Sequence, residues 1–139
     1  MEEPLTFHDQ HNHNIAAVLS TPNGPTTGLA VLCHGFLSGK NSTTNMTLTR
    51  LLNSHGIATF RFDFFGQGES QGPFEDLTTS LAVEQATTAI DLMAAKGYSR
   101  ISLVGSSFGG LVAILTTAHR PDIACLALKC PVESFPIRK

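Results

Sequence analysis

The hydrophobic positions along the chain follow two spacings, one typical of buried strands and one typical of helices. Continuous runs of apolar and β-branched residues predict four strands that are buried on both faces. These runs cover residues 28–33, 57–62, 100–105 and 123–129. Two shorter segments, 5–8 and 14–19, flank a polar turn and predict an antiparallel hairpin.

Three segments between these strands repeat apolar residues every three or four positions, as helices do. The first begins at about Thr44, and its expected buried face consists of Leu48, Leu51, Leu52 and His55. The second is striped by Val83, Ala86, Ile90 and Met93. The third, 111–119, is apolar enough to be a buried helix. Strands that alternate with helices predict a mostly parallel α/β sheet, and we expect one domain over residues 1–139.

Composition and charge exclude some classes of binding partner and indicate where the protein is located. Only 14% of the residues are charged, which suits strands covered on both faces. The net charge is −2 and no basic cluster occurs, so nucleic acid is not an expected partner. The sequence has neither a signal-peptide pattern nor an apolar run long enough to span a membrane. Cys33, Cys125 and Cys130 lie in apolar runs without metal-ligand spacing, which predicts buried free thiols and a cytoplasmic location.

The run Gly105-Ser106-Ser107-Phe108-Gly109 carries the clearest chemical signal. It lies between a predicted strand and a predicted helix, which is the context of a nucleophile elbow rather than of an ordinary glycine-rich turn. A strand that reverses into a helix within one turn strains the central residue, and larger side chains two positions away would meet backbone. We therefore predict that Ser107 is a catalytic nucleophile, because Ser106 lacks glycines at these offsets.

Two further motifs accompany the elbow. His34-Gly35-Phe36 follows a strand, and Asp63-Phe-Phe-Gly66-Gln-Gly68-Glu-Ser70 follows the next one. With these motifs, the chain resembles the α/β-hydrolase family, and it looks most like small bacterial esterases that include cinnamoyl and feruloyl esterases. It is also similar to serine-aminopeptidase-like and lysophospholipase-like hydrolases.

An oxyanion hole needs two backbone N–H groups aimed at the oxygen that gains charge. One is expected from Phe108, the residue after the nucleophile. The resemblance implies that Phe36 gives the second and that His34 orients this loop. We expect Gly66, Gly68 and Ser70 to form a structural turn at the rim, since the glycine spacing does not fit dinucleotide binding.

The resemblance implies a hydrolase of small carboxylic esters that needs no cofactor, with a peptidase and a non-catalytic fragment as the alternatives. The family's acid and histidine follow the serine in the chain, and this sequence reaches only Lys139. His119 is twelve helical residues beyond Ser107, about 18 Å away, and Glu133 could act only with a histidine. We therefore expect the N-terminal half of a hydrolase, whose last strand leaves an open sheet edge for self-association.

Three histidines, His8, His11 and His13, surround the turn of the predicted hairpin. Two histidines at alternate positions of a strand can share a metal ion. However, only Asp9 is near enough in sequence to add a ligand, so we expect surface histidines and no metal site.

Overall fold

The structure, a computed structural model, describes residues 1–131 and contains a six-stranded sheet. The strands are β1 (Glu2–His8), β2 (Asn14–Ser20), β3 (Gly28–Cys33), β4 (Ile57–Phe62), β5 (Ile101–Ser106) and β6 (Leu126–Lys129). The helices are α1 (Thr43–Ser54), α2 (Thr79–Ala95) and α3 (Phe108–His119), with a short 3₁₀ helix, η1 (Phe74–Asp76).

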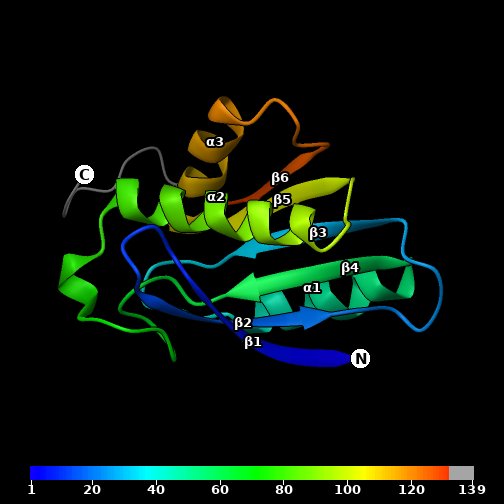
Figure 1. The fold of residues 1–139 in the computed structure, drawn as a ribbon, viewed down its shortest axis with the longest axis horizontal. Helices are drawn as coiled ribbons and strands as arrows, with labels where there is room; N and C mark the ends of the chain where they lie inside the picture. The colour runs from blue at the N-terminus through cyan, green and yellow to red at the C-terminus, as the bar shows by residue number, and fades with distance from the viewer. Residues whose placement is uncertain (132–139) are drawn as a thin grey trace.

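The strand order is β1-β2-β4-β3-β5-β6, and the central strands run parallel (Figure 1). β1 and β2 form the predicted antiparallel hairpin, and β2 pairs antiparallel with β4. The α/β fold class with a mostly parallel sheet is thereby confirmed. Because β3, β4 and β5 are parallel, the loops that follow them meet at one edge of the sheet, where ligands bind in open α/β folds.

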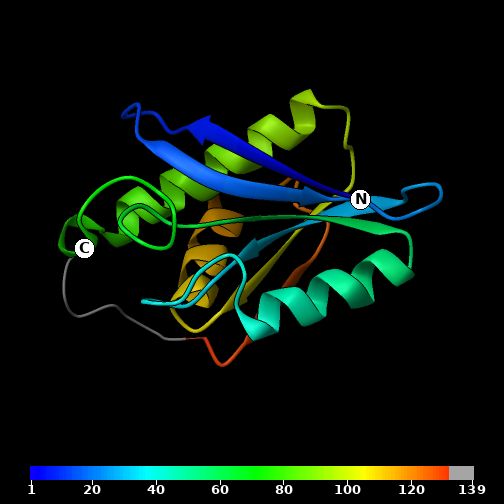
Figure 2. The ribbon, with the colours of Figure 1, turned by 90° about the horizontal axis from the view of Figure 1, so that it is seen from below.

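Helices cover both faces of the sheet. Figure 2 shows α2 on one side of the strands and α1 on the other. α3 packs against α2 and against β3 and β5. A series of neighbouring aromatic rings, from Phe62 through Phe64 to Phe108, crosses the core with centroid separations of 5.0 and 5.7 Å. This series fixes the start of α3, directly after Ser107, against the centre of the sheet.

The predicted buried face of α1 is wrong. Its fully buried residues are Asn45 and Thr49, whereas Leu51 is 54% exposed. The surface beneath the helix is polar, because the Asn45 amide donates to the Lys40 carbonyl at 3.1 Å and the Thr59 hydroxyl donates to that of Thr49 at 3.2 Å. Apolar spacing alone could not reveal these partners.

The last strand and two cysteines also differ from expectation. β6 begins at Leu126, three residues later than predicted, although Ala124 already donates to the Ile101 carbonyl at 2.9 Å. Cys125 and Cys130 are exposed at this edge, so only Cys33 is a buried thiol. Burial raises the pKa of Cys33 to about 12. Among the described residues, no helix combines the length and the apolar character that crossing a membrane requires.

Candidate active site

Ser107 occupies the turn between β5 and α3 with φ 54° and ψ −118°. This positive φ is rare for a residue with a side chain and is characteristic of a strained functional position. Its N–H donates to the Lys129 carbonyl at 3.0 Å, and its own carbonyl accepts the Gly110 N–H at 2.9 Å, inside the first turn of α3. The serine is therefore held at a helix N-terminus, where partial positive charge favours a developing anion.

The two glycines that flank the elbow permit close backbone contacts. A Cβ added at Gly105 would lie 2.3 Å from the Gly109 oxygen, and one added at Gly109 would lie 2.1 Å from the Cys33 oxygen. Both distances are far below van der Waals contact. The steric reason given for this spacing is thus correct, and it extends further, since α3 also approaches the end of β3.

The loop after β3 lies beside the elbow. A Cβ added at Gly35 would lie 3.5 Å from the Ser107 Cβ, and the rings of Phe36 and Phe108 meet edge to face with centroids 6.1 Å apart. The structure therefore brings Ser107, Phe36 and Phe108 together from two different loops. Their catalytic roles stay predictions.

His34 is buried, and both of its ring nitrogens have partners. Nδ1 lies 2.6 Å from the Gly35 carbonyl and must donate to it, while Nε2 accepts the Phe64 N–H at 3.0 Å. Burial lowers the pKa of His34, consistent with a neutral ring. Its acceptor nitrogen is occupied, so the contacts fit a loop-orienting residue and not a base for Ser107.

The glycine-rich loop after β4 is hydrogen-bonded to the loop after β3. The Asp63 carboxylate accepts the backbone N–H groups of Lys40 at 2.7 Å and of Glu69 at 2.9 Å. The Ser70 hydroxyl donates to the Asp63 carbonyl at 2.6 Å and accepts the Ala16 N–H at 2.9 Å, which joins the loop to the hairpin. These contacts agree with the structural role expected for Ser70.

The sequence analysis did not identify Lys40 and Gln67, which join these two loops. The buried Lys40 ammonium binds Asp63 at 2.8 Å and also contacts Glu69, and the Gln67 amide oxygen accepts the Leu37 N–H. Burial alone would lower the pKa of Lys40, but the hydrogen bonds to the two carboxylates outweigh it and raise that pKa. Neither residue belongs to a fixed motif position, so no local signal in the sequence indicated them.

The histidines of the hairpin lie at the surface, as expected, and two of them, His11 and His13, also have side-chain partners. Asp9, His11 and Glu84 bring potential metal-ligand atoms within 4.8 Å of one another. However, one Asp9 oxygen accepts two backbone N–H groups, and the other contacts His13 Nδ1 and Gln85 Nε2, each at 2.9 Å. Both Asp9 oxygens are thus used within the hairpin and in tying it to α2, while Glu84 contacts His11 through one carboxylate oxygen at 2.9 Å.

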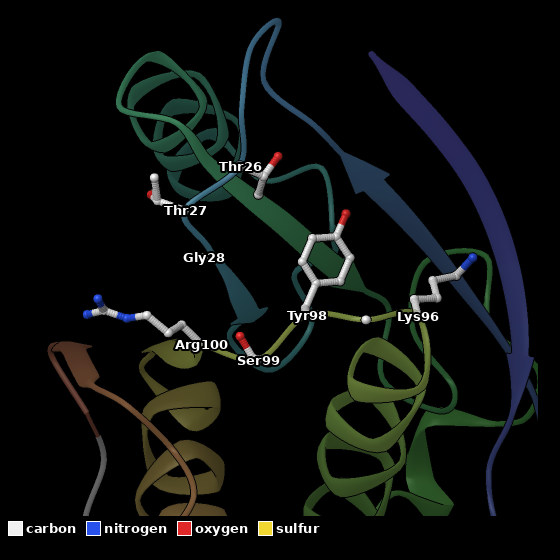
Figure 3. Close-up of a pocket in the computed structure, with 8 residues that line it drawn as sticks. Thr26, Thr27, Gly28, Lys96, Tyr98, Ser99 and Arg100 are labelled. Carbon is white, nitrogen blue, oxygen red and sulfur yellow. The ribbon is translucent and has the colours of Figure 1, made fainter.

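The remaining candidates lie elsewhere. His119 ends α3, the helix that begins beside Ser107, and Glu133 lies outside the described residues. A hollow of about 270 Å³ occurs at the opposite, amino-terminal edge of the strands and is lined by Gly28, Tyr98 and their neighbours. Figure 3 shows that Lys96 and Arg100 point away from each other there. The hollow therefore lacks converging charged groups and lies away from the elbow.

Comparison with known protein families shows the family to which the chain belongs. Residues 24–136 match the family model described as serine aminopeptidase, S33. The chain belongs to this family of α/β hydrolases. The match includes the elbow, the loop after β3 and the glycine-rich loop after β4.

Among curated proteins, the chain is similar to human monoglyceride lipase, with 33% identity over 105 residues that cover 72% of this chain and 33% of that protein. It is also similar to the human mitochondrial palmitoyl-protein thioesterase ABHD10, with 31% identity over 99 residues, 71% of this chain and 31% of that protein. The chain thus spans about a third of the length of these relatives.

The chain is also similar to solved structures. Est1E from Butyrivibrio proteoclasticus, determined with ferulic acid bound, matches with a TM-score of 0.80 and 29% identity, over 88% of this chain and 50% of that one. The α/β hydrolase GrgF from Penicillium sp. sh18 matches with a TM-score of 0.87 and 20% identity, over 94% and 46% of the two chains. The second likeness concerns the fold alone.

Proposed function

We propose that Ser107 is the nucleophile of a serine hydrolase that cleaves small carboxylic esters through an acyl-enzyme. The observation that carries this proposal is the strained Ser107 backbone at the N-terminus of α3, beside the loop of Phe36. The Ser107 hydroxyl attacks the ester carbonyl carbon, and the N–H groups of Phe36 and Phe108 hold the oxyanion. The alcohol leaves, and water then releases the acid from Ser107.

This mechanism needs a histidine to take the Ser107 proton and an acid to orient that histidine. Among the described residues, His34 has no free nitrogen for this purpose. The other histidines lie on the hairpin or close the far ends of α1 and α3. The base and its acid must therefore come from outside residues 1–131, and no cofactor is required.

The choice of esters is supported by the relatives named above, a monoglyceride lipase, a thioesterase and an esterase with bound ferulic acid. The second candidate is an amide hydrolase, which the family description as a serine aminopeptidase favours. Matched p-nitrophenyl ester and p-nitroanilide substrates with the same acyl group separate the two. We expect the larger kcat/KM on the ester.

The nucleophile is tested in a full-length form, in which this chain is continued by the acid and histidine segment of a family member. Ser107→Ala should abolish labelling by a fluorophosphonate and lower kcat by about 10⁶-fold. Ser106→Ala, the matched control one residue earlier, should retain labelling. The reverse pattern would refute the assignment.

The 139-residue chain alone should not hydrolyse p-nitrophenyl acetate above its Ser107→Ala background. An oxyanion hole without a base gives at most about 10³–10⁴ over water. Robust hydrolysis that depends on Ser107 would contradict this expectation and would require His34 to give up its bond to Phe64. The cytoplasmic location stays part of the proposal.

A further inference from the structure

Gln67 is a buried polar residue that the mechanism above does not use. It is 5% exposed and lies between the two glycines of the loop after β4. Its Oε1 accepts the Leu37 N–H at 2.5 Å, while its Nε2 is buried and has no hydrogen-bond partner among the described residues. Burying a side-chain amide costs free energy unless its polar atoms are hydrogen-bonded. The one side-chain hydrogen bond of Gln67, to Leu37, therefore needs a structural reason.

The position of Leu37 gives that bond a function. Leu37 directly follows Phe36 and has φ 62°, a left-handed conformation that a leucine rarely adopts. Its side chain is 67% exposed, so packing does not hold this backbone in place. The hydrogen bond from its N–H to Gln67 holds the peptide between Phe36 and Leu37 from outside the turn, which the Ser38 N–H closes on the Gly35 carbonyl at 3.1 Å.

The rest of the loop is tied on either side of this point. His34 Nε2 accepts the Phe64 N–H at 3.0 Å, and the Lys40 N–H donates to Asp63 at 2.7 Å. These two ties are six residues apart, and Phe36 lies between them. Of the ties to the glycine-rich loop, the one from Gln67 is the nearest in sequence to Phe36 on its C-terminal side.

We propose that Gln67 is a positioning residue of the oxyanion hole. Its Oε1 holds the Leu37 N–H and so restricts the neighbouring peptide, whose N–H belongs to Phe36. This inference rests on the proposed function, because it matters only if the Phe36 N–H stabilises the transition state. Gln67 itself need not touch the substrate.

The test compares two variants of nearly equal size in the full-length form. Gln67→Met removes the acceptor for Leu37. Gln67→Glu keeps a carboxyl oxygen, which accepts in either protonation state, and replaces the unpartnered Nε2 by a second oxygen, which also introduces a titratable group on the loop of Asp63 and Glu69. Loss of a whole oxyanion donor costs about 10²–10³ in kcat, so a donor that is merely misdirected should cost about 10-fold or more.

We expect Gln67→Met to lower kcat by about 10- to 100-fold while KM changes by less than about threefold, because the donor acts mainly in the transition state. Gln67→Glu should restore most of this loss. Amide hydrogen exchange at Leu37 should be faster in Gln67→Met than in the parent or in Gln67→Glu. This exchange is measured independently of turnover.

Equal kcat in Gln67→Met and the parent would overturn the proposal, as would a loss in Gln67→Glu as large as that in Gln67→Met. A matching rise in KM with unchanged kcat would also overturn it. Failure of the proposed function is a separate result, since it appears as fluorophosphonate labelling that survives Ser107→Ala.

Discussion

The two ends of the parallel strands differ in how closely their loops are packed. At the carboxyl ends, a Cβ at Gly109 would lie 2.1 Å from the Cys33 oxygen, so α3 touches the end of β3. At the amino ends, nothing lies within 4 Å of a Cβ added at Gly97, which lines the hollow of Figure 3. The same strands therefore carry a closely packed rim at their carboxyl ends and a more open turn, around Gly97, at their amino ends.

The ion pairs at the two ends of the strands also differ, because one is buried and the others are largely exposed. At the carboxyl end, the side chains of Lys40 and Asp63 are 6% and 2% exposed and lie 2.8 Å apart. At the amino end, where α3 finishes, Arg120 binds the largely exposed Asp91 and Asp122 at 2.7 and 2.9 Å. Ion pairs in water contribute little to stability, whereas breaking a buried pair leaves an uncompensated charge. The rim is thus the part of the molecule in which single substitutions should have large effects.

Gly109→Ala should have the largest effect on stability. The added methyl group would overlap backbone atoms of Cys33 and His34, which cannot move without displacing β3 or the loop that follows it. We expect a loss of about 4 kcal/mol or more in the free energy of unfolding, measured by urea denaturation. Gly24→Ala is the control, because nothing lies within 4 Å of its added Cβ and its cost should stay below about 0.5 kcal/mol. Equal losses in the two variants would remove the steric argument.

Lys40→Met should have the next largest effect. It leaves the Asp63 carboxylate buried with its two backbone N–H donors but without its cation. We expect a cost of about 3 kcal/mol, at the lower end for a broken buried pair. Arg120→Met, the matched change at the amino end, should cost less than about 1 kcal/mol in the same denaturation experiment. If both variants lost the same free energy of unfolding, the buried ion pair and the exposed one would contribute equally to stability, and the argument would be wrong.

The buried Lys40 also predicts a dependence on pH. Burial alone would lower its pKa in the folded state, but the hydrogen bonds to Asp63 and Glu69 together outweigh burial and raise it, so its stabilising contribution is complete below the unfolded pKa of about 10.4. That contribution is lost as the pH rises through the folded pKa. The Cys33 thiol, with a pKa raised to about 12 by burial, gives a loss of the same sign that begins at lower pH. The melting temperature of the parent should therefore fall more steeply above about pH 10.5 than that of Lys40→Met. Parallel curves of melting temperature against pH would contradict this assignment.

What the sequence could predict depends on how local each signal is. The elbow was predictable because the strand, the helix and both glycine offsets are adjacent in the chain, and the steric reason for the glycines is confirmed. The α1 face was not predictable, because Asn45 and Thr49 are buried by partners on the loop after β3 and on β4. Gln67 reaches Leu37 across thirty residues, and only the meeting of two loops at one sheet edge reveals that contact.

The smallest expected free-energy change concerns the outer edge of β6. In the described part of the chain, β6 pairs with β5 alone, and Leu128 is 41% exposed on it. Unpaired strand edges with exposed apolar side chains favour pairing with a second copy, so we expect the 139-residue chain to self-associate there. Leu128→Lys should leave stability within about 0.5 kcal/mol but shift the chain toward monomer in sedimentation velocity. Leu51→Lys, at an exposed leucine of α1 away from this edge, is the control and should leave the association unchanged. A parent chain that sediments as a sharp monomer and unfolds cooperatively would contradict the association, and an equal effect of both substitutions would place it elsewhere than on β6.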